Sequence, residues 1–264
     1  MTIQDIGNAA AELSKARHRN TLLDTAFVPA DIDEAYALQD AITRLQPKAP
    51  AGWKLGATST AALELLALEE PFFGPLFDTW HHVTEGDGFI LPTSTLPVAV
   101  ETEVVLFFKD DVRASDGEDD ATLEARIRAA IAAAAPGFEI VGTRYDRGEH
   151  PEGLPLVADF GGNVATVVGK PVRFEADTVH PAHGVSLSIN DKPAITGHCD
   201  MNLTGNLMAM VMWFLRHERF QARGLRAGEF LFTGTCTGIT PLAVGDTACA
   251  DLGSLGSIRI ELAG

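Results

Sequence analysis

The sequence has few cysteines, and none of them forms a metal-binding or disulfide pattern. The three that occur, Cys199, Cys236 and Cys249, are an odd number and include no C-x-x-C spacing. Zinc knuckles and disulfide frameworks need paired cysteines, so the sequence argues against both classes of site. We interpret the three thiols as small buried side chains.

Long apolar runs are also missing. Residues 1–19 contain no continuous apolar core of the kind that a signal peptide has. No stretch approaches the roughly 20 apolar residues of a membrane span. We therefore expect a cytoplasmic protein without a membrane partner.

Basic residues are scarce relative to acidic ones. The chain has 36 Asp and Glu residues against 20 Lys and Arg residues, which gives a formal net charge of −16. Such a charge repels nucleic acid and anionic membranes and argues against both as partners. An anionic substrate would need a local cation, and this need favours a metal ion in the site.

Hydrophobic residues, in contrast, make up 46% of the 264 residues, enough for a substantial core. Their spacing is helical in some segments and alternating in others. The predicted helices cover residues 3–19, with a basic cluster at the end, and 31–45, 60–68, 123–135, 154–163 and 205–223. The predicted strands lie in residues 52–59, 88–91, 98–108, 138–145, 164–169, 185–196, 229–234, 247–252 and 257–262. We predict an α+β fold in which a helical N-terminal portion, residues 1–80, packs on a mixed β portion, residues 81–264.

One predicted strand, Val98–Phe108 (VAVETEVVLFF), carries two acids in an otherwise apolar sequence. Glu101 and Glu103 are two residues apart, so their side chains point to the same face. At about 5 Å and an effective dielectric near 20, their charges repel by about 3 kcal/mol. A cation such as Mg²⁺, which carboxylates and waters commonly hold, would remove that repulsion. The alternative is an edge strand whose acids lie in water.

Other polar side chains stand out in glycine-rich or apolar surroundings. Lys54 lies between the glycines of GWKLGATS, where a solvated surface lysine is the ordinary expectation. The predicted loop PFFGPLFDTWHH, residues 71–82, ends in Asp78, His81 and His82. For histidines that follow a turn, structural or surface roles are more common than ligand roles.

Five ordered motifs give the chain a resemblance to a known family. They are GWKLGATS, VETEVVLFF, FEIVGTRY, AGEFLFTGTCTGITPLAVGDT and GSLGSIRIEL, and they span nearly the whole chain. In this order they resemble the 2-keto-4-pentenoate hydratase and 4-oxalocrotonate decarboxylase family of the fumarylacetoacetase-like superfamily. The resemblance implies that the β portion is a mixed β-sheet roll or sandwich of the fumarylacetoacetase-like type.

The resemblance also implies site residues. In the family, three glutamates hold Mg²⁺ or Mn²⁺, and a lysine of the GxKxG stretch lies in the active site. A threonine-rich turn borders the substrate carboxylate, although this turn could equally be a plain glycine-rich strand exit. The matching residues here are Glu101, Glu103 and Glu139 for the metal, Lys54 for the active site, Thr235 and Thr237 of the turn Thr233–Thr237, and Asp159 of the ADFGGN segment.

Several positions depart from the family pattern. Thr102 replaces the proline of a usual EPE strand, and Gly142 and Thr143 replace an Asp and a Ser after the third glutamate. Phe160 and Gly161 stand where the family has polar residues. These positions would line or support the pocket, so they affect substrate choice rather than metal binding.

The implied activity is that of a lyase acting on a small 2-oxo or 2-hydroxydienoic acid. We expect hydration of 2-hydroxypenta-2,4-dienoate (2-keto-4-pentenoate) to 4-hydroxy-2-oxopentanoate in aromatic-compound catabolism, with Lys54 or Asp78 as the proton carrier. The alternatives are decarboxylation of 4-oxalocrotonate and a metal-binding protein without catalysis. A hydrolase, which would use a pair such as His82 and Glu85, ranks third. We also expect a homo-oligomer.

Overall fold

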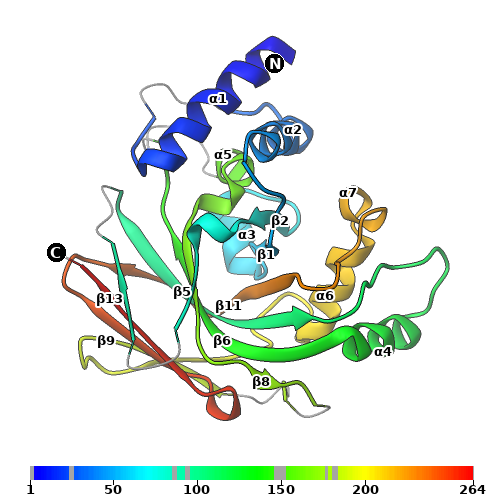
Figure 1. The fold of residues 1–264 in the computed structure, drawn as a ribbon, viewed down its shortest axis with the longest axis vertical. Helices are drawn as coiled ribbons and strands as arrows, with labels where there is room; N and C mark the ends of the chain where they lie inside the picture. Colours follow the sequence, from blue (N-terminus) through cyan, green and yellow to red (C-terminus); the bar gives the residue numbers. More distant parts are fainter. Residues whose placement is uncertain are drawn as a thin grey trace.

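The computed structural model of the protein describes residues 3–23, 27–84, 88–92, 96–145, 153–175, 178–179 and 184–263. Two mixed β-sheets and a set of short helices make up this part of the chain (Figure 1). The larger sheet has the strand order β2-β1-β11-β5-β6-β7-β3, with β8 paired to β6, and the smaller has the order β10-β9-β12-β13-β4. The strands are β1 Gly52–Gly56, β2 Phe72–Leu76, β3 His81–Val83, β4 Phe89–Leu91, β5 Val98–Phe108, β6 Ile131–Val141, β7 Asn163–Val168, β8 Val172–Arg173, β9 Gly184–Ile189, β10 Ile195–His198, β11 Phe230–Leu242, β12 Thr247–Asp251 and β13 Ser257–Leu262.

Helices α1, α2 and α5 gather at the top of the molecule in the view of Figure 1, and α4, α6 and α7 gather at its right-hand side. The helices are α1 Ile3–Arg19, α2 Ile32–Arg44, α3 Thr60–Leu66, α4 Asp120–Ala130, α5 Gly153–Ala158, α6 Leu207–Arg216 and α7 Glu218–Gln221, with the 3₁₀ turns η1 Asp78–Trp80, η2 Phe160–Gly162 and η3 Gly253–Leu255. The predicted α+β class is confirmed.

The boundary that we placed at residue 80 does not separate helices from strands. Strands β1 and β2 precede it, yet β1 pairs in parallel with β11 and antiparallel with β2. Both strands are therefore part of the larger sheet, together with β5 and β6. The division into residues 1–80 and 81–264 remains a prediction.

Both faces of strand β5 are covered by apolar side chains, and its two acids lie in these surroundings. Its even-numbered residues, among them Val100 and Val104, face the main hydrophobic core. The odd-numbered face carries Glu101 and Glu103 and then Val105, which packs in a second, smaller cluster with Phe230 and Phe232. The glutamates thus lie at the end of an apolar patch rather than on a water-facing edge.

Several segments differ from their predicted structure: the predicted helix 154–163 ends at Ala158, the predicted strand 229–234 continues to Leu242, and three further differences have a physical reason. Residues 131–135 are alanine-rich and favour a helix, but they open β6, because Ala133, Ala134 and Ala135 pair with the large side chains of β5. The predicted helix 205–223 breaks at His217, whose backbone turns to φ −59°, ψ 128°. The predicted loop 71–82 contains β2, an edge strand that tolerates Pro75 because an edge need not donate every N–H.

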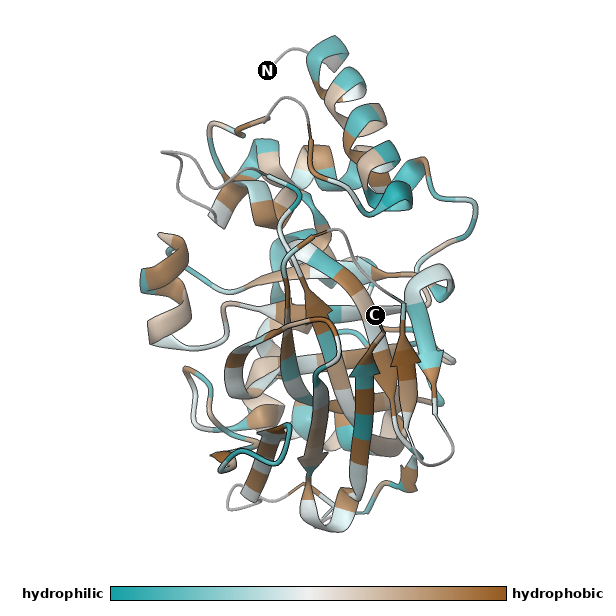
Figure 2. Ribbon diagram, turned by 90° about the vertical axis from the view of Figure 1, so that its left-hand side faces the viewer, coloured by the Kyte–Doolittle hydropathy of each residue, from teal (hydrophilic) through white to brown (hydrophobic). Residues whose placement is uncertain are grey.

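Hydrophobic residues concentrate on the strands, whereas α1 shows hydrophilic turns (Figure 2). In the described part of the chain, no helix combines the length and the apolarity that crossing a bilayer requires.

Candidate metal centre

Three glutamates from two neighbouring strands converge on one point. Glu101 of β5 lies directly opposite Glu139 of β6 in the antiparallel register, and Glu103 lies two residues further along β5, opposite Gly137. One carboxylate oxygen from each glutamate lies within 4.8 Å of the other two. The structure therefore brings together the three acids that the resemblance assigns to a metal ion.

The electrostatics of this cluster are unfavourable without a further positive charge. Glu103 and Glu139 are fully buried, and Glu101 is partly exposed. Burial, followed by the charge of Glu139, raises the pKa of Glu101 to about 7. The same two causes, with the charge of Glu101 added, raise the pKa of Glu103 well above its usual range. Three close carboxylates in an apolar setting need more positive charge than Lys54 alone provides.

The oxygens of the cluster fit a divalent cation. Among the described residues, neither Glu103 Oε1 nor Glu139 Oε2 receives a hydrogen bond, although both atoms are buried. Buried oxygens without donors are costly, and a hard cation such as Mg²⁺ or Mn²⁺ would satisfy them. Gly137 leaves the position opposite Glu103 free of a side chain, and a Cβ there would lie 2.4 Å from Val105 Cγ2.

Lys54 is buried beside the cluster rather than solvated on the surface. Its Nζ lies 3.4 Å from Glu139 Oε2 and donates a hydrogen bond of 3.2 Å to the carbonyl of Gly161. The ammonium group also lies 5.1 Å from the centroid of the Phe72 ring. Strand β1 holds the lysine in place, because Lys54 pairs with Phe232 of β11 on one side.

The position of Lys54 leaves no room for a side chain at Gly161 of the ADFGGN segment. The residue has φ +68°, and a Cβ on it would lie 2.2 Å from both Cε and Nζ of Lys54. The departure from the family pattern at this position therefore has a steric reason in this chain. A side chain at residue 161 would displace the lysine that pairs with Glu139.

We expect Gly161→Ala to lower turnover by at least about tenfold, because it moves Lys54 away from the centre. Gly117→Ala is the matched control, since Gly117 has φ +72° but nothing within 4 Å of its Cβ position. Both substitutions strain the backbone by about 1–2 kcal/mol, so the melting temperature should fall in each. Steady-state kinetics of the two variants, compared at equal folded fraction, separates the strain from the displacement. Equal activity in both would contradict this role of Gly161.

Metal affinity should depend on pH in a defined direction. Without a cation Glu101 keeps its proton up to about pH 7, so binding below that pH must displace the proton. Affinity should rise with pH and be at least about tenfold higher at pH 8 than at pH 6, the ratio that a single pKa of 7 gives, because the raised pKa of Glu103 acts in the same direction. Calorimetric titration with Mg²⁺ at both pH values measures this, and an affinity that does not change with pH would show that Glu101 is not a ligand.

The predicted threonine-rich turn lies within β11, where two register shifts interrupt the pairing with β5. The N–H of Gly234 donates to Glu103 Oε2 at 2.6 Å, which fixes that carboxylate. Thr235 pairs with Glu103 across the strands but uses its hydroxyl to donate to the carbonyl of Gly238. The buried hydroxyl of Thr237 has no hydrogen-bond partner among the described residues. Of the two threonines, Thr237 is the one with a free polar group to offer a ligand.

Asn163 contacts the centre, although no specific feature of the sequence pointed to it. It is buried at the start of β7, and its Nδ2 donates to Glu139 Oε1 at 2.9 Å. Glu139 is thus held from two sides, by Asn163 at one oxygen and by Lys54 at the other. The only signal in the sequence was the position of Asn163 at the end of the ADFGGN segment.

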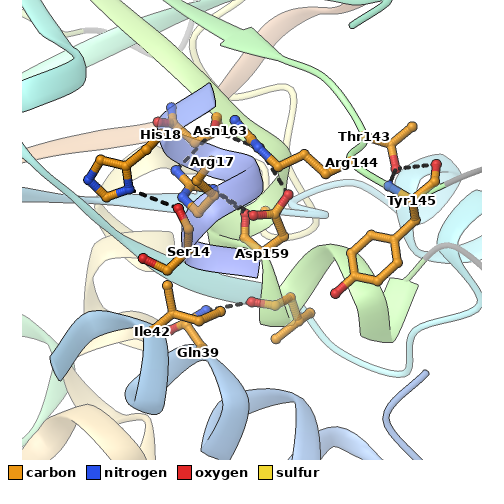
Figure 3. Close-up of polar contacts among 12 residues, drawn as sticks. Ser14, Arg17, His18, Gln39, Ile42, Thr143, Arg144, Tyr145, Asp159 and Asn163 are labelled. Atoms are coloured by element: carbon orange, nitrogen blue, oxygen red, sulfur yellow. Dashed lines mark hydrogen bonds and ion pairs between the residues drawn. The ribbon is translucent and has the colours of Figure 1, made fainter. Parts of the chain in front are cut away.

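Asp78 and Asp159 are not brought to the three glutamates. Asp78 lies on η1 with its side chain 58% exposed and pairs at 3.3 Å with Lys48, whose side chain is 70% exposed. Asp159 is fully buried and accepts hydrogen bonds from Arg17 and Arg144 (Figure 3). Each oxygen of its carboxylate is thus bonded to one of these arginines, and its contact with substrate stays a prediction.

The two histidines have local partners. His81 Nδ1 lies 2.8 Å from Thr166 Oγ1, and its ring stacks on Phe230. Burial lowers the pKa of His81 to about 4. His82 stacks on Phe89, whereas Glu85, its partner in the hydrolase alternative, lies outside the described residues.

The chain is similar to known enzymes over most of its length. No protein-family model matches the chain. The 2-keto-4-pentenoate hydratase of Paraburkholderia xenovorans (strain LB400) is 28% identical over 269 residues, which cover 99% of this chain and 96% of that protein. Among solved structures, 4-oxalocrotonate decarboxylase from Pseudomonas putida G7, complexed with magnesium and adipate, matches with a TM-score of 0.83 at 21% identity over 99% of this chain and 98% of that one. Fumarylpyruvate hydrolase from Pseudomonas aeruginosa, in complex with Mn²⁺ and pyruvate, matches with a TM-score of 0.62 at 14% identity over 80% of this chain and 88% of that one.

These similarities extend over the whole chain in the first two cases. They confirm the fumarylacetoacetase-like fold that the motifs predicted. The chain is therefore similar over 99% of its length to a 2-keto-4-pentenoate hydratase and has the fold of 4-oxalocrotonate decarboxylase, which confirms the resemblance of its sequence.

Proposed function

We propose that the protein is a Mg²⁺- or Mn²⁺-dependent lyase that hydrates 2-hydroxypenta-2,4-dienoate to 4-hydroxy-2-oxopentanoate. The observation that carries the proposal is the cluster of the buried Glu103 and Glu139 with the partly exposed Glu101, beside which Lys54 lies. The cluster occurs in a chain that is similar over its full length to a 2-keto-4-pentenoate hydratase. The solved relatives of the same fold contain magnesium or manganese.

The three glutamates would hold the ion, and the ion would polarise the C2 carbonyl of a 2-oxo acid. The hydration itself requires protons to move, because the dienol must first become an enone by protonation at C5. Water then adds at C4, and C3 gains a proton. Lys54 is the residue that we assign to this transfer, since its Nζ is buried and touches the carboxylate of Glu139.

Thr237 is the residue that we assign to substrate binding. Its buried hydroxyl has no partner in the described part of the chain, and the turn that carries it also supplies the Gly234 N–H to Glu103. A hydroxyl in this position can donate to a substrate carboxylate. Thr235 would shape the turn through its bond to Gly238.

The main alternative, decarboxylation of 4-oxalocrotonate, needs a site for a second carboxylate. Arg17 and Arg144 bond to the backbone of Asn163 beside the centre, but both are already paired with Asp159. Lys54 is paired with Glu139. Within the described ranges, the cations that contact these site residues are thus engaged, which supports a substrate with a single carboxylate.

An assay with both substrates tests the proposal. Purified protein with Mg²⁺ or Mn²⁺ should consume 2-hydroxypenta-2,4-dienoate, seen as loss of its conjugated ultraviolet absorbance, and yield 4-hydroxy-2-oxopentanoate. Release of CO₂ from 4-oxalocrotonate with the dienoate left untouched would replace the proposal by the decarboxylase alternative. If neither substrate reacts, the result favours the alternative of a metal-binding protein without catalysis.

We also propose that the protein forms a homo-oligomer and that it works in the cytoplasm. Val83 and Ile90 are more than half exposed, and they lie on β3 and β4, the terminal strands of the two sheets. Exposed apolar side chains on edge strands are typical of surfaces that another chain covers. Light scattering of the purified protein gives the number of subunits, and a monomer at all concentrations would exclude this arrangement.

A further inference from the structure

We propose that Arg17 of the N-terminal helix α1 is a positioning residue for the metal centre, acting through Asn163 on Glu139. The inference rests on the three-glutamate centre proposed above. It gives α1 a functional role, although the helix contributes no glutamate to the centre.

The chain of contacts begins at Glu139. Asn163 Nδ2 donates to Glu139 Oε1, so the position of Asn163 sets the direction of that carboxylate. The backbone carbonyl of Asn163 in turn accepts a hydrogen bond of 3.1 Å from Arg17 Nη2 and one of 3.3 Å from Arg144 Nη1. Both arginines therefore hold Asn163, the residue that orients the proposed metal ligand Glu139.

The two arginines are themselves fixed by Asp159 (Figure 3). Arg17 Nη1 lies 2.7 Å from Oδ1 of Asp159 and 3.0 Å from the backbone carbonyl oxygen of the same residue. Arg144 Nη1 lies 2.9 Å from Oδ2 of Asp159. All three side chains are at most 2% exposed. Arg17 thus uses its two terminal nitrogens for different partners, with Nη1 on Asp159 and Nη2 on Asn163.

The guanidinium plane of Arg17 has a second set of contacts. It lies 4.2 Å from the centroid of Phe160 and 4.8 Å from that of Trp80. Burial, together with the charge of Arg144, lowers the pKa of Arg17 to about 10, so the group stays charged at neutral pH. A lysine at this position could keep the charge but could not form the forked, planar contact.

The segment that Arg17 holds also reaches Lys54. Residues 159–163 run from the carboxylate of Asp159 through Phe160, under the guanidinium, to the Gly161 carbonyl that accepts from Lys54 Nζ. Residues 160, 161 and 162 all have positive φ, so the segment is a tight turn that needs fixed ends. Arg17 bonds to both ends of this turn, at Asp159 and at Asn163. The positions of Asn163 and Lys54, the two partners of Glu139, therefore depend on Arg17.

The test is calorimetric titration of Mn²⁺ into the wild-type protein, Arg17→Met and Arg17→Lys, with folding checked by circular dichroism. We expect the dissociation constant to rise about tenfold in Arg17→Met and by a smaller factor in Arg17→Lys. Turnover at saturating Mn²⁺ should fall with little change in KM, because the lost interaction orients Glu139 and Lys54 rather than the substrate.

Leu13→Ala is the control, because Leu13 is a fully buried residue of α1 and its truncation loosens the packing of the helix while Arg17 is kept. Its dissociation constant should stay within about twofold of the wild type in the folded protein. If Arg17→Met does not fold, the Arg17→Lys result decides alone. Unchanged Mn²⁺ affinity in the folded arginine variants overturns the inference, and so does an equal loss in Leu13→Ala. A wild type that binds Mn²⁺ but hydrates no dienoate leaves this test intact and rejects only the proposed activity.

Discussion

Replacing Lys54 by Met should lower turnover of 2-hydroxypenta-2,4-dienoate by about 10²- to 10⁴-fold, the span expected when a positioned acid or base is removed. Methionine has a similar length and is apolar, so it can fill the space beside Phe72 without carrying a proton. Metal affinity should stay the same or rise, because the substitution removes a positive charge 3.4 Å from Glu139 Oε2. Steady-state kinetics at saturating Mg²⁺ gives the first quantity and calorimetry the second.

Lys109→Met controls for the loss of a lysine as such, since Lys109 is exposed at the end of β5. Asp78→Asn tests the other proton carrier that the sequence suggested, and we expect it to retain near-normal turnover because Asp78 lies at the surface with Lys48. Near-normal turnover in Lys54→Met would remove the lysine from the mechanism. An effect confined to KM would make it a carboxylate anchor instead.

Glu139→Gln should weaken Mg²⁺ binding by at least about tenfold, or about 1.4 kcal/mol, because a neutral amide replaces a charged ligand of nearly the same shape. Activity should fall with it and recover in part at high Mg²⁺, since mass action can refill a weakened site. The amide can offer its oxygen to Asn163 or to Lys54 but not to both, so some loss of thermal stability should accompany the change.

Glu124→Gln is the matched control, because Glu124 lies on α4 in a partly exposed ion pair with Arg128. Its Mg²⁺ affinity should equal that of the wild type. Equal dissociation constants for the wild type and Glu139→Gln would mean that Glu139 is an ordinary strand acid and not a ligand.

The sequence predicted the elements of the fold better than their limits. Strand β5 was recognisable in the sequence because two acids interrupt an apolar pattern. The structure confirms this strand over the whole predicted range, Val98–Phe108. Residues 131–135 were misassigned because alanine favours a helix locally, whereas the fit of small side chains against Leu106 and Phe107 of the neighbouring strand is a tertiary effect. No local pattern records that fit.

The site residues likewise include some that the sequence predicted and some that only tertiary contacts reveal. Glu139 could be joined to Glu101 only through the resemblance, since the pairing of β5 with β6 is not visible in spacing. Arg17 was part of a basic cluster that suits any helix C-terminus, and its actual partner Asp159 lies 142 residues away. Asp159 was assigned to substrate because its motif was recognised, but the side chain turned out to be enclosed by two arginines. Partners that come from distant segments cannot be read from either segment alone.

Crystals grown with Mn²⁺ and measured at the manganese absorption edge test the metal centre most directly. We expect one strong anomalous peak that lies about 2.1 Å from a carboxylate oxygen of each of Glu101, Glu103 and Glu139, the bond length typical of a hard divalent ion of this size. A strong peak at another position, or no peak between these three carboxylates at saturating Mn²⁺, would contradict the proposal that the three glutamates hold the metal ion.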